Sequence, residues 1–145
     1  MKHVYIFLML LIPKISMEYS QEPKFEVDLC FDDDKTLLYT TTYCEARGEG
    51  VVGTVAVLDV IKNRILHSKF PSTVDSVILQ RKQFYVDSCK VTPPYFRHLV
   101  DSLWPLPSSH SFLYFASLKD VKNKKIKKWI KRHKLHRIGK HHFFK

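Results

Sequence analysis

The segment from Val51 to His67 constrains the fold most, because it is apolar on nearly every side for seventeen residues. A strand in a globular protein rarely exceeds about ten residues. A run of this length therefore predicts a buried helix at the centre of the molecule, although its valines lower the helix propensity. The polar pair Asn63-Arg64 falls near the end of the run, where we expect both residues to have structural roles.

The first 22 residues have the pattern of an export signal. Lys2 and His3 precede an apolar run from residue 4 to residue 12, and Pro13 follows it. The run is too short to cross a bilayer, which requires about 20 apolar residues. We therefore expect an exported protein, periplasmic or extracellular, with one folded domain over residues 23–145. An uncleaved anchor and an ordinary core strand stay open as alternatives for residues 1–22.

Positive charge is concentrated in the region 119–145. This region holds 12 Lys and Arg residues against the single acid Asp120, whereas the whole 145-residue chain has a net charge of +10. The rest of the chain is therefore close to neutral. A basic segment of this kind predicts contact with an anionic polymer or surface, such as acidic lipid or an anionic wall. Charge is the only feature that favours nucleic acid, so we expect no specific nucleic-acid partner.

The three cysteines, Cys30, Cys44 and Cys89, do not form a metal or redox motif. No CxxC pair is present, which argues against a zinc ribbon and a thioredoxin-type site. An odd number leaves at least one cysteine unpaired or paired elsewhere, and we expect Cys44 to be a small buried residue. His133 and His136 are one helical turn apart, but no carboxylate or cysteine is in register with them. We expect no metal and no cofactor.

Helix starts and stops divide the remainder of the chain. Gly48 and Gly50 predict the end of a first helix, and Pro93-Pro94 predicts the start of a later one. In that later helix Tyr95, Leu99 and Leu103 are expected to lie on one face. A second stripe, in the basic segment, contains Ile126, Trp129, Ile130 and His133. The expected helices are 35–47, 72–80, 92–105 and 121–136, and the expected strands are 112–115 and 138–144.

The segment 45–49 places two carboxylates and a guanidinium within five positions, directly before the apolar run. A carboxylic acid that transfers protons must be held on a rigid element and kept neutral near the working pH. A helix end that leads into a buried segment can supply both conditions. Glu45 is therefore the candidate catalytic residue.

These residues belong to a longer ordered series. Glu45-Ala46-Arg47-Gly48-Glu49 is followed by Asn63-Arg64, Phe70-Pro71 with Thr73-Val74, and Gln83-Phe84, and a weaker match continues to His142-Phe143-Phe144. The series resembles the SleB/CwlJ-type cell-wall hydrolases, which include spore-cortex-lytic enzymes and relatives in bacteriophages. The resemblance covers about residues 36–145.

The resemblance implies a mostly helical α+β fold, lysozyme-like or lytic-transglycosylase-like, that acts on peptidoglycan. It implies cleavage of the glycan strand between N-acetylmuramic acid and N-acetylglucosamine, with Glu45 as the acid. In a lytic transglycosylase one catalytic Glu suffices. A muramidase, an amidase on the same polymer, and a non-enzymatic module that binds membrane or wall through its basic helix remain alternatives. Bacteriophage lysis, which would place the enzyme in the host periplasm, and bacterial wall remodelling both stay open.

Other residues of the series have less certain roles. Glu49 either takes part directly or positions other groups, and Arg47 either pairs with a carboxylate or holds substrate. Gln83 is a candidate for hydrogen bonds to glycan hydroxyl and acetamido groups, and Tyr85 and Tyr114 are candidates for the lining of the cleft. The chain departs from the family at Ala116, where members commonly have His after the aromatic pair.

Overall fold

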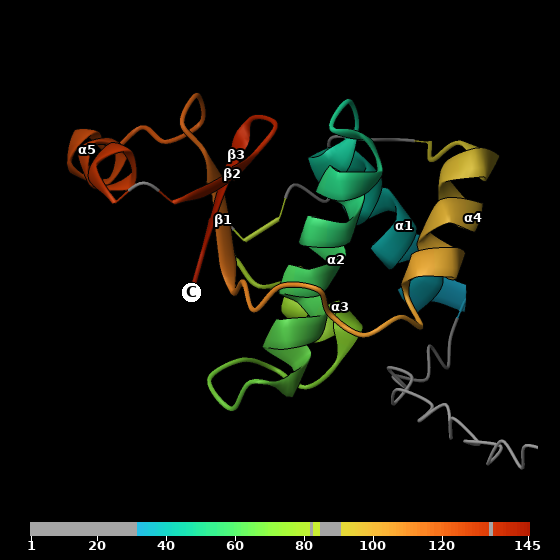
Figure 1. Cartoon of the computed structure of the whole chain (residues 1–145). Helices are drawn as coiled ribbons and strands as arrows, with labels where there is room; N and C mark the ends of the chain where they lie inside the picture. Colours follow the sequence, from blue (N-terminus) through green and yellow to red (C-terminus); the bar gives the residue numbers. More distant parts are fainter. Residues whose placement is uncertain (1–31, 82, 85–90, 134) are drawn as a thin grey trace, which may run out of the picture.

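The computed structural model describes residues 32–81, 83–84, 91–133 and 135–145. Within them the chain forms a group of helices and a small sheet (Figure 1). In chain order the elements are α1 (Asp32–Ala46), α2 (Gly50–Leu66), α3 (Val74–Ile78), α4 (Pro94–Leu103), β1 (Tyr114–Ser117), α5 (Lys124–Arg132), β2 (His136–Ile138) and β3 (His141–Phe144).

Helix α2 is the centre of the molecule, as the apolar run predicts. Its residues Ala56, Val60 and Ile61 are fully buried, and it packs against α1, α3, α4 and β2. Figure 1 shows the sheet on one side of α2, with α1 and α4 on the other and α5 beyond the sheet. The apolar side chains of α2 therefore form a core shared by the helices and the strands.

The polar end of α2 fixes the segment that leads into β1. Asn63 Nδ2 donates hydrogen bonds to the carbonyl oxygens of His110 and Phe112, at 2.7 and 2.9 Å. Arg64 Nε donates to the carbonyl oxygen of Leu113 at 2.7 Å. Burial lowers the pKa of Arg64 to about 10, so the side chain is still charged at neutral pH. The predicted structural roles of Asn63 and Arg64 are confirmed.

Two buried ionisable residues of α2 were not anticipated. Lys62 is 2% exposed, and its Nζ donates to the carbonyl oxygens of Leu103 and Leu106 at 3.1 and 2.7 Å. Asp59 is 1% exposed, and its Oδ2 accepts from the backbone N–H groups of Ser109 and His110. Both side chains thus satisfy backbone groups at the end of α4 and in the chain that follows it, which periodicity alone does not reveal.

The sheet is antiparallel with the strand order β1-β3-β2. A single terminal strand over 138–144 was predicted, and this prediction is wrong. Gly139 has φ +56°, a left-handed conformation that turns the chain between β2 and β3 into a hairpin. Strand β1 begins at Tyr114, two residues later than expected.

The buried faces of α4 and α5 also differ from the predicted stripes. On α4, Leu99 and Leu103 are half-buried against the core, but Tyr95 is 68% exposed. The buried residues of this helix are Phe96 and Val100, one turn apart. On α5 only Ile130 is buried, and Ile126 and Trp129 are 50% and 42% exposed. Of the predicted α5 stripe, therefore, one residue is buried.

The predictions for α3 and for the cysteines are only partly confirmed. The helix expected over 72–80 is shorter, because α3 runs only from Val74 to Ile78, and the hydroxyl of Thr73 donates to Asp75. Cys44 is half-buried and disulfide-bonded, so the expectation that it is simply a small buried residue is wrong. Cys30, Cys89 and the signal-like residues 1–22 lie outside the described residues.

Across the described ranges, none of the helices combines the length and the apolar character needed to cross a membrane.

Candidate active site

The turn between α1 and α2 presents the residues of the segment 45–49. Glu45 lies in the last turn of α1 and is 9% exposed. Gly48 and Gly50 adopt left-handed conformations, with φ +87° and +67°, which end one helix and start the next. As expected, the glycines separate Glu45 and Glu49, so the two carboxylates are not neighbours on one helix.

A cavity of about 450 Å³ opens where this turn faces the sheet. Four predicted site residues line it: Glu45, Arg47, Glu49 and Gln83. The remaining lining residues are Cys44, Phe115, Ala116, Ser117, Lys119, Asp120, Val121, Lys140 and His141. The wall thus carries three carboxylates and three Lys or Arg side chains, a polar surface suited to a ligand rich in hydroxyl and amide groups.

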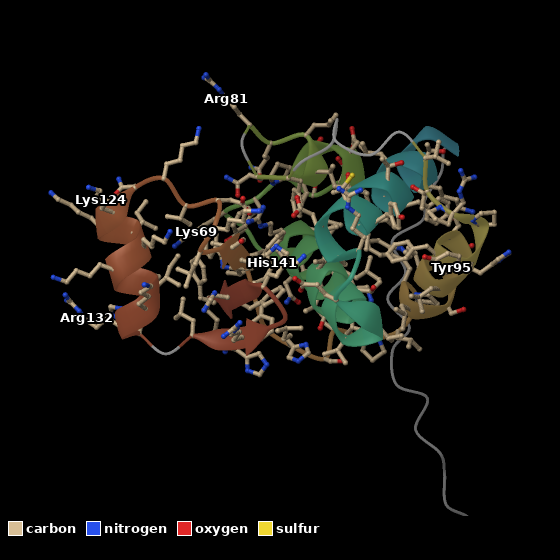
Figure 2. All side chains as sticks on the ribbon, turned by 90° about the horizontal axis from the view of Figure 1, so that it is seen from above. Lys69, Arg81, Tyr95, Lys124, Arg132 and His141 are labelled. Carbon is tan, nitrogen blue, oxygen red and sulfur yellow. The ribbon has the colours of Figure 1, made fainter. Side chains whose placement is uncertain are left out.

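Glu49 points into the wall of the cavity towards the β2–β3 hairpin. Its side chain is 3% exposed, and its Oε1 accepts a hydrogen bond of 2.9 Å from the backbone N–H of Lys140. Its Oε2 lies 3.1 Å from Nδ1 of His141, although this contact lacks the alignment of a hydrogen bond. Figure 2 shows His141 in the middle of the molecule, between the C-terminal strands and the first helices. Glu49 therefore ties the start of α2 to the hairpin.

Two glycines make room for Glu49. A Cβ atom on Gly53 would lie 2.5 Å from Cβ of Glu49, and a Cβ on Gly139 would lie 2.6 Å from its Cδ. Both separations are far below van der Waals contact. The chain can bring α2 and the hairpin this close to Glu49 only because both positions lack a side chain.

Tyr114 was expected in the cleft but does not line the cavity. Its ring packs against Phe70 and Phe144, and the guanidinium of Arg64 lies 5.5 Å from its centroid. Successive residues of a strand face opposite sides, so Phe115 faces the cavity and Tyr114 does not. Tyr85 lies outside the described residues.

The sequence analysis missed His141, Lys140, Lys119 and Asp120. His141 comes from β3, and β3 pairs with β1 so that His142 is opposite Ala116. His141 itself is opposite Ser117, and both residues line the cavity. The motif series ran through this region, but no local pattern indicated that residue 141 would meet residue 49.

The two histidines considered as metal ligands are not brought together. The ring of His133 packs on Trp129, and that of His136 packs on Phe112. Within the part of the chain that the structure describes, no group of three or more His, Cys, Asp or Glu residues is arranged to hold a metal ion.

The pattern of a known family extends over most of the chain. A model of the Cell Wall Hydrolase family matches residues 48–144, more than half of the sequence. This chain belongs to the Cell Wall Hydrolase family. The membership confirms the predicted enzyme class and the SleB/CwlJ-type resemblance. The matched residues begin at Gly48, so Glu45 lies just before them.

Individual relatives agree with this assignment. The spore cortex-lytic enzyme of Bacillus cereus is 32% identical over 121 residues, which cover 78% of this chain and 44% of that protein. The spore cortex-lytic enzyme of Halalkalibacterium halodurans is 45% identical over 53 residues, which cover 37% of this chain and 16% of that protein. This cell wall hydrolase therefore spans less than half of the length of these relatives.

Solved structures show the same fold. The catalytic domain of the Bacillus cereus SleB protein superposes with a TM-score of 0.61 at 30% identity, over 79% of this chain and 91% of that one. The catalytic domain of the germination-specific lytic transglycosylase SleB from Bacillus anthracis gives 0.62 at 27% identity, over 82% and 100%. The predicted fold class, mostly helical α+β and lysozyme-like, is confirmed.

Proposed function

We propose that this cell wall hydrolase cleaves peptidoglycan glycan strands between N-acetylmuramic acid and N-acetylglucosamine, by lytic transglycosylation with Glu45 as the catalytic residue. The observation that carries the proposal is the position of Glu45, a largely buried carboxyl in the wall of a 450 Å³ polar cavity. The fold around it is similar to that of a catalytic domain described as a lytic transglycosylase.

The reaction needs a group that first gives and then takes one proton. The carboxyl of Glu45 donates its proton to the glycosidic oxygen as the bond to C1 of the muramic acid breaks. The 6-hydroxyl of the same sugar then attacks C1, and the Glu45 carboxylate accepts the hydroxyl proton. The products are a 1,6-anhydro end and a new 4-hydroxyl end. A buried acid suits this cycle because burial favours the neutral form that must act first.

Residues at the cavity mouth have binding roles in this proposal. Arg47 and Gln83 are exposed where they line the cavity, so both side chains can reach a bound strand. The guanidinium matches the carboxylates of lactyl and peptide groups, and the amide can both donate to and accept from the sugars. Neither residue needs to change its protonation state.

Digestion of purified peptidoglycan, with the muropeptides resolved by mass spectrometry, tests the proposal. We expect anhydro-muropeptides from the native protein and none from Glu45→Gln. The exposed carboxylate Asp101 lies on α4, outside the cavity, so Asp101→Asn should retain activity. Reducing muramic ends would indicate a muramidase instead, and released peptides an amidase. Full activity of Glu45→Gln would refute the role of Glu45.

Helix α5 supports a second role, adsorption to an anionic wall or lipid surface. By helical spacing, Lys125, Lys128 and Arg132 lie opposite the buried Ile130. Figure 2 shows Lys124 and Arg132, near the two ends of the helix, pointing away from the body. The exposed Trp129 is of a residue type favoured at membrane interfaces.

A charge reversal on α5 tests this role separately from catalysis. Lys125→Glu with Lys128→Glu should weaken binding to isolated walls or to vesicles that contain anionic lipid, and added salt should have the same effect. Reversal of the exposed Lys35 on α1 is the matched control. Equal binding by all three proteins would rule out α5 as the contact.

The proposed substrate lies outside the cytoplasmic membrane, which agrees with the export predicted from residues 1–22. Sequencing the N-terminus of the exported protein would establish whether this segment is removed.

A further inference from the structure

Glu49 and His141 form a buried pair of polar side chains in which the acid faces the imidazole. Packing of the fold does not require such a pair. Their side chains are 3% and 11% exposed, and Oε2 of Glu49 lies 3.1 Å from Nδ1 of His141. Within the described residues neither atom has a hydrogen-bond partner, although the two atoms lie 3.1 Å apart. Burying both groups costs desolvation energy that an apolar pair at the same positions would avoid.

The pair lies in the wall of the cavity and not in the core behind it. Both residues line the cavity together with Glu45. Oε1 of Glu49 is held by the backbone N–H of Lys140, which leaves Oε2 to face the imidazole. The ring of His141 is held against Phe115 in an edge-to-face contact with centroids 5.1 Å apart. One nitrogen of the imidazole thus faces the carboxylate, and one side of the ring packs against an aromatic ring.

We propose that His141 is a substrate-binding residue and that Glu49 is the positioning residue that orients it. The inference rests on the proposed function. The carboxylate of Glu49 holds the Nδ1 proton of the imidazole, so the other nitrogen, Nε2, accepts a hydrogen bond from a hydroxyl or acetamido N–H of the glycan bound beside Glu45.

The chemistry of imidazole explains why a carboxylate partner is needed. A neutral histidine has one N–H donor and one nitrogen acceptor, and the group bonded to one nitrogen decides which role the other plays. A carboxylate only accepts, so it keeps the proton on Nδ1 and leaves Nε2 as an acceptor. An amide nitrogen in place of Oε2 would impose the opposite arrangement.

Two substitutions at His141 separate binding from support of the hairpin. The amide of Asn reaches the position of Nδ1 and can still contact Glu49, whereas the longer Gln places its amide near the position of Nε2. We expect His141→Asn to remain folded while kcat/KM on soluble glycan strands falls by about ten-fold, the value of one lost hydrogen bond. We expect His141→Gln to recover part of that loss.

Glu49→Gln provides an independent measurement. Its amide oxygen can still accept from the backbone N–H of Lys140, while its nitrogen faces His141 and reverses the tautomer. We expect kcat/KM to fall by about ten-fold with little change in Tm. The matched control is His142→Asn, because His142 is the next residue of the same strand and does not line the cavity. Its kcat/KM should stay within about two-fold of the native value.

The proposal is overturned if His141→Asn or Glu49→Gln retains native kcat/KM. It is also overturned if His141→Gln is no better than His141→Asn, or if activity falls only in proportion to folded protein measured by circular dichroism. These outcomes differ from failure of the proposed function, in which the native protein itself releases no anhydro-muropeptides.

Discussion

Glu49 fits into the structure because residues on two other elements have no side chain. Gly53 on α2 and Gly139 in the hairpin both approach it more closely than a methyl group would allow. Gly139 carries a second requirement, since its φ of +56° is unfavourable for any residue with a Cβ. A glycine elsewhere in the chain that meets only the second requirement offers a direct comparison.

Gly48 supplies that comparison. It has φ +87°, but a Cβ built on it has no atom within 4 Å. Gly48→Ala should therefore lower the free energy of unfolding by about 1 kcal/mol through backbone strain alone. Gly139→Ala should lower it by about 2–4 kcal/mol, because the overlap with Glu49 adds to the strain. Denaturant unfolding of both variants tests the difference, and equal losses would show that Glu49 moves aside without cost.

Asp59 gives a pH dependence whose sign follows from burial. Desolvation raises the pKa of Asp59 above 3.8, and the opposing effects of His110 and Lys62 are smaller. The folded state therefore binds the Asp59 proton more tightly than the unfolded state does. This contribution to stability is fully present below pH 3.8 and is lost as the pH rises through the folded pKa.

Asp59→Asn removes this titration while it retains an acceptor for the backbone N–H groups of Ser109 and His110. We expect the free energy of unfolding of the native protein, relative to Asp59→Asn, to decrease as the pH rises from 3.8. Urea unfolding of both proteins over a pH series measures the difference. A relative stability that increases with pH would mean that the charge partners outweigh burial.

At the level of elements, α5 has one buried side chain and contacts the sheet through an aromatic pair. Ile130 is 1% exposed, whereas Ile126, on the same helix, is 50% exposed. The ring of Trp129 contacts Phe144 of β3 with centroids 5.6 Å apart. The helix is therefore part of the folded domain even though most of its surface carries lysine.

The two isoleucines predict unequal effects of one substitution. Ile130→Ala should lower the free energy of unfolding by about 2–4 kcal/mol because it removes buried methyl groups and leaves a cavity. Ile126→Ala should change it by less than about 1 kcal/mol. Thermal or urea unfolding measures both. Similar small losses would show that α5 is detached from the sheet in solution.

Local patterns predicted the helices better than the sheet. The long apolar run specified α2, and Gly48, Gly50 and Pro94 marked helix ends that the structure confirms. The hairpin was not predicted because β2 and β3 have only 3 and 4 residues, too few for a clear alternation of apolar and polar side chains. On the predicted face of α4, Leu99 and Leu103 pack against the core, but Tyr95 is exposed and Phe96 is buried instead. Periodicity alone cannot choose between two adjacent aromatic residues.

At the scale of the whole molecule, the cavity joins parts of the chain that are far apart in sequence. The turn at residues 45–49 forms one wall, and residues 115–121 with the hairpin form another. The segment 45–49 predicted the first wall because its residues lie close together in sequence. The longer motif series added Gln83. It did not predict His141, because the pairing of residues 49 and 141 depends on the complete fold.

Strand β3 is the element on which this assembly depends, since β1 and β2 pair with it and not with each other. A variant that ends at Lys140 should lose both strand pairings and the contact between Glu49 and His141. We expect it to show no cooperative unfolding transition and no activity. A variant without Lys145 alone, an exposed residue beyond β3, should behave like the native protein. A folded, cooperative protein that ends at Lys140 would contradict the central role of β3.

The strand order also imposes a sequence of events on synthesis. The ribosome synthesises β1, α5 and β2 before β3. The two outer strands therefore cannot form their sheet hydrogen bonds until the strand between them has been made. The helices around α2 have their local contacts much earlier. Glu45 is therefore made long before the far wall that encloses it, and a partly synthesised chain carries the proposed acid without a site in which to use it.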